Sequence, residues 1–266
     1  MSTPVFIEGI SGVGKSTLSS MLCDKLHHLG HPSNCFLEGD TNSPLDLFYV
    51  SYLTVEEYAS LLHSYPTQAD ELQKNSLVEP DYILVRYQDT NRRYYSSELY
   101  EYLRAHELCY KAENPLPLSK YGEVFLNLWA RFARRTATTQ SILIFDGSLL
   151  HHQINDLMRN YAASEKQIKA YLSMLIQTIE PLHPMVFYLF TQDVGTQFAK
   201  ARQSRGQMPP TCEQVAFWEK RMRMDLSVLN GLAVQTHRID ISDGSWNSAL
   251  ERIVSSITNM DAFRPR

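Results

Sequence analysis

Residues 9–16 read Gly-Ile-Ser-Gly-Val-Gly-Lys-Ser, which fits the G-x-x-x-x-G-K-[ST] pattern of a phosphate-binding loop. In such a loop, backbone N–H groups surround phosphate oxygens at the N-terminus of a helix. We expect Lys15 to reach the β- and γ-phosphates and the Ser16 hydroxyl to bind Mg²⁺. The spacing therefore predicts binding of a nucleoside triphosphate. The predicted contacts are made by Gly9, Ser11, Gly12, Val13, Gly14, Lys15, Ser16 and Thr17.

Acidic residues follow two apolar runs that are typical of buried strands. The run 141–145 is followed by Asp146, where a P-loop protein places a carboxylate that helps to order Mg²⁺ and its waters. The run 34–38 ends in Glu38, and Asp40 follows it. Either carboxylate could accept a proton from an attacking hydroxyl group or contact Mg²⁺. Asp and Gly are also ordinary turn formers, so the sequence does not rank Glu38 against Asp40.

Basic residues gather after the apolar run 185–190. Lys200, Arg202 and Arg205 lie within six residues, just before Gly206 and the Pro209-Pro210 pair. This pattern predicts a lid over residues 196–212, in which Arg202 and Arg205 neutralise the charge that develops during phosphoryl transfer. The alternative is an exposed basic helix face. We expect the later cluster Lys220, Arg221 and Arg223 to lie on the surface.

A long segment, residues 45–135, separates the second apolar run from the third and holds 12 of the 15 tyrosines. We expect helices at roughly 45–63, 96–111 and 119–135, with an irregular or hairpin segment around 82–95. Most of these tyrosines must pack helix on helix. Aromatic rings and arginines could also hold a flat, anionic acceptor; the candidates are Arg86, Arg92, Arg93, Trp129, Arg131 and Phe132.

Five apolar runs predict a buried parallel sheet: residues 5–8, 34–38, 141–145, 185–190 and 237–241. A helix with 3.6-residue spacing is expected over 168–179 and is ended by Pro181. A closing helix is expected over 246–263, preceded by a turn and cap at 243–245. Alternating strands and helices predict a doubly wound α/β fold. We expect a nucleotide-binding core (1–44 and 136–266) with a mostly helical acceptor-binding insertion (45–135).

The composition limits the classes of function. A formal net charge of -4 gives the 266-residue chain no general affinity for nucleic acid or an anionic membrane. No apolar run reaches the ~18 residues of a membrane span, and the first strand leaves no room for a signal peptide. The four cysteines are far apart, and the histidines form no convincing metal site. We expect a cytoplasmic protein, and a homodimer is left open.

The segment Phe6-Ile7-Glu8-Gly9, followed by residues 11–17, is similar to the opening of the thymidylate kinase and deoxynucleoside kinase families. The resemblance extends to Glu38, at the place of the deoxynucleoside kinases' general base, and to the lid arginines. It implies the P-loop kinase sheet of five parallel strands, ATP with Mg²⁺, and an acceptor enclosed by helices inserted after strand two. Two features depart from those families. Residues 146–148 read Asp-Gly-Ser instead of an Asp/Glu-Arg pair, and the insertion shows no acceptor-base signature.

These patterns together predict an ATP-dependent kinase of a small molecule. Lys15 and the loop hold the triphosphate, Ser16 and Asp146 hold Mg²⁺, and Glu38 or Asp40 acts on the acceptor hydroxyl. The acceptor is a nucleoside or nucleotide, or another alcohol such as a sugar or an antibiotic. The rival is a nucleotide-binding switch or ATPase that engages a protein partner, although no Asn-Lys-x-Asp guanine motif is convincing.

Overall fold

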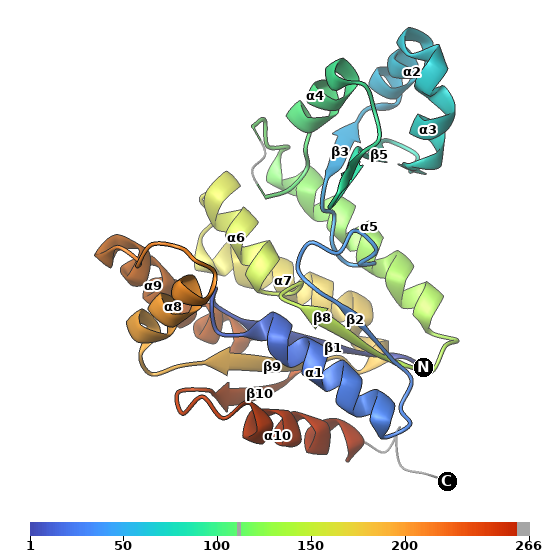
Figure 1. The fold of residues 1–266 in the computed structure, drawn as a ribbon. Coiled ribbons are helices and arrows are strands. Elements are labelled where there is room, and N and C mark those ends of the chain that lie inside the picture. Colours follow the sequence, from blue (N-terminus) through green and yellow to red (C-terminus); the bar gives the residue numbers. More distant parts are fainter. Residues whose placement is uncertain (111–112, 260–266) are drawn as a thin grey trace.

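The computed structural model describes residues 1–110 and 113–259. At its centre is a parallel five-stranded sheet in the order β10-β9-β1-β8-β2 (Figure 1). The strands are β1 (Thr3–Gly9), β2 (Ser33–Phe36), β8 (Ile142–Asp146), β9 (Met185–Phe190) and β10 (Gln235–Asp240). The five predicted strands and the predicted α/β fold are confirmed.

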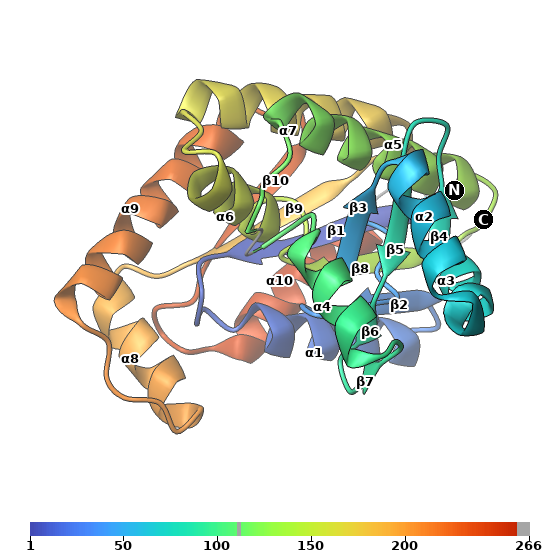
Figure 2. The ribbon, with the colours of Figure 1, turned by 90° about the horizontal axis from the view of Figure 1, so that it is seen from above.

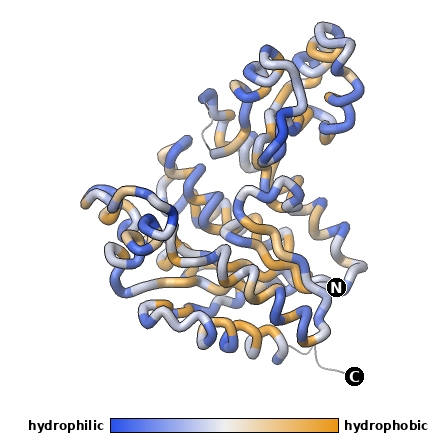
Figure 3. The backbone as a smooth tube through the Cα atoms, viewed as in Figure 1, coloured by the Kyte–Doolittle hydropathy of each residue, from blue (hydrophilic) through white to orange (hydrophobic). Residues whose placement is uncertain are grey.

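Helices cover both faces of this sheet (Figure 2). On one face, α1 (Lys15–His28) and α10 (Trp246–Thr258) pack against Val5, Ile7 and Ile144. On the other, α5 (Leu118–Thr136), α6 (His151–Asn160), α7 (Glu165–Ile179) and α9 (Cys212–Leu229) pack against Phe6 and Phe145. Because successive side chains of a strand point to opposite faces, an unbroken apolar strand serves both layers. The hydrophobic segments accordingly gather in the sheet (Figure 3).

The segment between β2 and α5 forms a group of its own above the sheet (Figure 1). It contains an antiparallel sheet in the order β3-β5-β4, made of β3 (Val50–Leu53), β4 (Ser76–Val78) and β5 (Ile83–Arg86). Around it lie α2 (Val55–Ser64), α3 (Ala69–Lys74) and α4 (Ser97–Ala105). A small hairpin joins β6 (Gln88–Asp89) to β7 (Arg92–Arg93). Four tyrosines help to form the apolar core of this group: Tyr58, Tyr87, Tyr95 and Tyr100.

The structure corrects two helix boundaries in this segment. The helix predicted from residue 45 begins at Val55, because Thr54 and Glu57 form a capping box and the preceding residues are strand β3. The helix predicted over 96–111 ends at Ala105, and Glu107 forms a β-bridge with Ser51. Residue 111 and the predicted end of the closing helix, 260–263, lie outside the described residues. The hairpin expected around 82–95 and the helix expected over 119–135 are confirmed.

The remaining core helix, α8 (Val194–Ser204), directly follows β9 in the chain. It lies with α6 on the side toward which the carboxyl ends of the sheet strands point (Figure 1). Short 3-10 turns occur at Pro66–Gln68 and Glu180–Leu182, the second of which ends α7 at Pro181 as predicted. Over the described residues, no helix is both long enough and apolar enough to cross a membrane.

Candidate active site

The loop between β1 and α1 has the backbone of a phosphate cradle. Gly12 and Gly14 have φ angles of 83° and 85°, a left-handed conformation that favours glycine. Gly14 is the N-cap of α1, and among the described residues no side chain caps that helix end. The first N–H groups of the helix therefore remain available to an anion, at the end where the helix dipole also favours negative charge.

Two helices press against this loop and leave no room for larger residues. A Cβ atom on Gly12 would lie 2.9 Å from the Cβ of Ala201 on α8, and one on Gly14 would lie 2.2 Å from the Trp246 ring on α10. The Gln197 side chain on α8 also donates a hydrogen bond to the Gly12 carbonyl, at 3.0 Å. Glycine is therefore required at both positions, and the packing of α8 and α10 supports this loop conformation.

Lys15 supplies the buried cation of the cradle. Its Nζ donates to the Ile10 carbonyl at 3.2 Å, so the ammonium group lies over the loop. Burial lowers the pKa of Lys15, and the nearby carboxylates of Asp146, Glu38 and Glu8 oppose that shift. A triphosphate bound here would add negative charge beside the ammonium group and favour its protonated form.

Ser16 and Asp146 meet as the sequence suggested. The Ser16 hydroxyl donates to Asp146 Oδ2 at 2.5 Å, and the Glu38 backbone N–H donates to the same oxygen at 3.3 Å. The second oxygen, Oδ1, is buried and has no hydrogen-bond partner among the described residues. A buried oxygen that lacks a partner is costly unless a ligand or water satisfies it.

This arrangement fits Mg²⁺, which keeps several waters and needs only one or two protein ligands besides the phosphates. Ser16 and Asp146 are the residues that would hold it. Mg²⁺ supplies positive charge that offsets the negative charge of the triphosphate.

Glu38 and Asp40 differ in their surroundings. Glu38 lies just beyond β2; its backbone N–H bonds Asp146, and its side chain is 54% exposed. Asp40 accepts hydrogen bonds from the Asn42 backbone N–H at 2.8 Å and the Asn42 side chain at 3.1 Å, which is the geometry of an Asx-turn. The carboxylate of Asp40 therefore closes a turn, while that of Glu38 is free to face a ligand.

Sequence reasoning missed a buried histidine–aspartate pair beside Glu38. The His152 ring donates from Nδ1 to Asp46 at 2.8 Å, and His152 Nε2 lies 4.0 Å from Glu38 Oε1. Asp46 also accepts hydrogen bonds from the hydroxyls of Ser43 and Ser148. The only sequence signal was a carboxylate set between two apolar residues, at 45–47.

A second missed residue is Glu8, near the end of the central strand. Its carboxylate is buried and accepts hydrogen bonds from the backbone N–H groups of Leu149, at 2.7 Å, and His151, at 2.9 Å. Burial raises the pKa of Glu8 to about 7, although these hydrogen bonds act in the opposite direction. An acid inside an apolar strand was the available signal. Through these hydrogen bonds, Glu8 joins the start of α6 to the end of β1, directly before the phosphate-binding loop.

The predicted lid arginines lie on the segment that packs against the loop. Arg202 on α8 donates from Nε to the Met208 carbonyl at 2.5 Å, and its guanidinium group lies 5.7 Å from the centre of the Phe198 ring. Arg205 is the exposed C-cap residue of α8. The structure thus brings the lid segment to the site without joining either guanidinium group to the loop.

The expectation that Arg221 lies on the surface is wrong. Arg221 is completely buried, pairs with Asp225 at 2.6 Å and donates to the carbonyls of Leu150 and His151. Its position on the inner face of α9 lets it join that helix to the start of α6. The apolar residues around it in sequence, not its basic neighbours, indicated this inner face.

The arginines of the insertion are dispersed. Arg131 pairs with Glu79, whereas Arg92 and Arg93 lie over the rings of Tyr94 and Tyr100 on the β6–β7 hairpin and α4. The hairpin reaches the turn after Glu38, since Thr41 donates to Asp89 at 2.9 Å. Trp129 and Phe132, which the sequence left open as ligand contacts, are buried in the main core.

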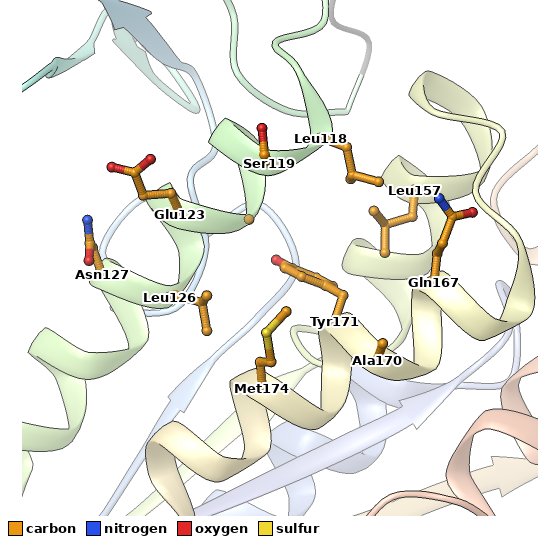
Figure 4. Close-up of a pocket in the computed structure, with 11 residues that line it drawn as sticks. Leu118, Ser119, Glu123, Leu126, Asn127, Leu157, Gln167, Ala170, Tyr171 and Met174 are labelled. Atoms are coloured by element: carbon orange, nitrogen blue, oxygen red, sulfur yellow. The ribbon is translucent and has the colours of Figure 1, made fainter.

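Several cavities lie outside the phosphate-binding loop. One of about 560 Å³ lies between α5 and α7 and is mostly apolar (Figure 4). None of its described lining residues belongs to the loop or to the carboxylate cluster. A smaller cavity of about 290 Å³ lies beside the insertion and is lined by Asp46, Lys74 and Arg86, among others.

No family model matches the chain, and no curated protein matches it in sequence. Among solved structures, it is similar to a deoxyadenosine kinase from M. mycoides with bound dATP: 11% identity, 97% of this chain and 100% of that one covered, and a TM-score of 0.44. It is also similar to the YorR protein from Bacillus subtilis in complex with phosphorylated GDP: 11% identity, 96% and 95% covered, and a TM-score of 0.44. Identities of 11% and TM-scores of 0.44 do not show which ligand this chain binds.

Proposed function

We propose that this chain is an ATP-dependent kinase that transfers the γ-phosphoryl group to a hydroxyl or phosphate of a nucleoside- or nucleotide-like acceptor. One observation carries the proposal: the Ser16 hydroxyl is hydrogen-bonded to Asp146 at the end of the phosphate-binding loop, and the other Asp146 oxygen is buried with no partner among the described residues. A P-loop protein that binds Mg²⁺ with a nucleoside triphosphate needs these two groups together.

The acceptor side is built around Glu38. Its backbone N–H bonds Asp146 and its side chain is exposed, so the carboxylate can accept the proton of an acceptor hydroxyl while the oxygen attacks the γ-phosphorus. The new O–P bond forms as the bond to the β-phosphate oxygen breaks, and ADP leaves. Asp40 is the less suitable base, because its carboxylate is already occupied by two hydrogen bonds from Asn42.

The lid segment and the insertion complete the proposed enzyme. Residues 196–212 act as a lid whose Arg202 and Arg205 turn toward the transferring group. The packing of α8 against Gly12 and the exposure of Arg205 support this role, whereas Arg202 is half-buried. The insertion, residues 45–135, closes over the acceptor and excludes water, which would otherwise compete as the nucleophile. Residues 1–44 and 136–266 form the nucleotide-binding core.

The test is an ATP-consumption screen over nucleosides, nucleoside monophosphates, sugars and aminoglycoside-like alcohols, with Lys15→Ala as the control. ADP formation that depends on one acceptor class, together with a phosphorylated product, supports the proposal and names the class. ATP hydrolysis that responds to a protein partner and to no small acceptor would favour a switch or ATPase instead. Turnover that survives Lys15→Ala would contradict the donor site.

A further inference from the structure

The pair formed by Asp46 and His152 is more firmly held than a buried histidine needs. Asp46 accepts from His152 Nδ1 at 2.8 Å, from Ser43 at 2.7 Å and from Ser148 at 2.5 Å. Both members of the pair are almost completely buried, at 4% and 3% exposure. The two serine hydroxyls bond Oδ2 of Asp46, so its Oδ1 faces His152 Nδ1 and orients the ring.

That orientation directs Nε2 toward Glu38. Nε2 is buried and has no hydrogen-bond partner among the described residues, while Glu38 Oε1 lies 4.0 Å away. The edge of the imidazole also faces the stacked rings of Phe48 and Tyr110, which offer no competing carboxylate. A movement of roughly 1 Å by the exposed Glu38 side chain brings Oε1 to hydrogen-bond distance.

A purely structural role does not account for this geometry. The bond from Nδ1 to Asp46 already fixes the ring, and a buried polar atom without a partner is destabilising. Pairing with Asp46 needs only one donor, and the second ring nitrogen of His152 is not required for it. The chain keeps a donor at this place, beside the carboxylate that faces the acceptor.

We propose that Asp46 and His152 hold the Glu38 carboxylate in position for the acceptor, so that His152 is a positioning residue of the reaction. The inference rests on the proposed kinase function, in which Glu38 accepts the proton of the acceptor. The imidazole lies between two carboxylates and donates to both, from Nδ1 to Asp46 and from Nε2 to Glu38. Glu38, which is otherwise exposed, thereby gains one orientation.

The charges around His152 favour the form that this role requires. Burial alone would lower the pKa of His152, but the Asp46 carboxylate and its hydrogen bond, with Glu38 and Glu8, raise it overall. Asp156, on the same helix, acts in the same direction, whereas His151 opposes it. A protonated imidazole carries an N–H on both nitrogens, one for each carboxylate.

The same contacts join the acceptor side to the donor side. Ser148, which donates to Asp46, lies two residues after Asp146, and the Glu38 backbone N–H donates to Asp146 itself. A shift of the segment after β8 would therefore move the Mg²⁺ ligand and the support of the base together.

The first experiment needs no acceptor. The His152 imidazole is titrated by NMR in the wild-type chain, with its signal identified by its loss in His152→Gln. We expect the His152 midpoint to fall by about half a unit to one unit in Glu38→Gln, because an opposite charge at ion-pair distance is removed. Asp40→Asn, on the same turn, is the matched control and should leave the midpoint unchanged. An equal midpoint in wild type and Glu38→Gln would overturn the proposal.

The second experiment separates the two ring nitrogens. An asparagine at 152 can bond Asp46 as Nδ1 does, and a glutamine can place its amide nitrogen near the position of Nε2. With an acceptor from the screen, we expect kcat to fall about a hundredfold in His152→Asn and much less in His152→Gln, since small misplacements of a catalytic group are costly. The binding of MgATP should be unchanged in both. The reverse order would show that the bond to Asp46 is all that matters.

The two experiments fail separately. A wild-type chain that phosphorylates nothing would remove the proposed function, while the NMR titration would still decide whether His152 holds Glu38. An active kinase in which the His152 titration ignores Glu38 would keep the function and remove the positioning role. If a variant at 152 does not fold, the comparison of wild type with Glu38→Gln still gives the answer.

Discussion

Replacing Asp146 by asparagine keeps the shape of the side chain and removes one negative charge from the wall of the site. The asparagine oxygen can still accept from the Ser16 hydroxyl, as Asp146 Oδ2 does at 2.5 Å. What changes is the buried Oδ1, which has no partner among the described residues and is the atom that would accept a hydrogen bond from a metal-bound water. In Asp146→Asn this acceptor becomes an N–H donor.

A hydrogen bond to a charged group contributes about 1.5–3 kcal/mol. Since about 1.4 kcal/mol corresponds to a factor of ten, the free Mg²⁺ needed for half-maximal turnover should rise by roughly tenfold to a hundredfold. Metal-free ATP should bind as well as before or better, because a negative charge beside the triphosphate has gone. The two effects have opposite signs, which a general loss of structure cannot produce.

The assay measures ADP formation at saturating ATP while free Mg²⁺ is varied, with calorimetry of ATP binding in the presence of a chelator. Asp70→Asn, the same chemical change at an exposed position of α3, is the matched control and should behave like wild type. If Asp146→Asn needs no more Mg²⁺ than wild type, Asp146 does not belong to the metal site. If it loses metal-free ATP binding as severely as turnover, its role is structural.

Three further predictions test separate parts of the site. Glu38→Gln should lower kcat by about 10²–10⁴ in the acceptor assay, whereas Asp40→Asn, whose side-chain oxygen can still accept from Asn42, should stay near wild type; equal losses would contradict the choice of base. Gly14→Ala should weaken MgATP binding at least tenfold in calorimetry, since its Cβ would lie 2.2 Å from Trp246. Gly30→Ala is the control for backbone strain alone, which costs about 1–2 kcal/mol, because Gly30 has a similar φ of 80° and no described atom lies within 4 Å of the added Cβ. Glu8→Gln should flatten the pH dependence of stability. The pKa of Glu8 is about 7 in the folded chain and 4.5 ordinarily, so the folded chain keeps this proton up to a higher pH than the unfolded chain. Wild type should therefore lose about 3 kcal/mol of unfolding free energy between about pH 4 and pH 8, and the variant should not. Chemical denaturation at several pH values measures this difference, and parallel curves for the two proteins would show that Glu8 is not the group responsible.

The sheet and the phosphate-binding loop were predictable because both are local in sequence. Buried parallel strands need continuous apolar runs, and the loop needs glycines at fixed spacing before a helix. The meeting of Ser16 and Asp146, 130 residues apart, was also predictable, since the carboxyl ends of neighbouring parallel strands lie at one edge.

The insertion was less predictable because its strands are short. Val50–Leu53 has only four residues, and such a run is compatible with a helix until its partner is known. The Thr54–Glu57 capping box did mark the true helix start. Arg221 was misjudged because a basic run usually faces solvent, whereas its partner Asp225, one helical turn later, places both on the inner face.

The pair of Asp46 and His152 could not have been found from sequence, because no motif joins them and neither residue lies at the end of a sheet strand. Each looks ordinary alone. Only the fold brings the loop after β2 beside the start of α6 and so places His152 Nε2 near Glu38. Contacts between buried polar side chains that are distant in sequence therefore become visible only in the structure.

One segment, residues 146–152, links all parts of the candidate site. Asp146 bonds Ser16 on the donor side, and Ser148 and His152 bond Asp46 on the acceptor side. Between them, Gly147 has a φ of 78°, and a Cβ there would lie 3.1 Å from His151 and 3.3 Å from Lys15, so this backbone is also closely packed, although less tightly than Gly12 and Gly14. Glu8 and Arg221 hold the same segment from β1 and α9. All of these contacts except the partly buried one between Ser16 and Asp146 are buried, so the metal ligand and the support of the base are held in one packed segment. Such rigidity suits phosphoryl transfer, in which catalysis depends mainly on positioning and on electrostatic stabilisation.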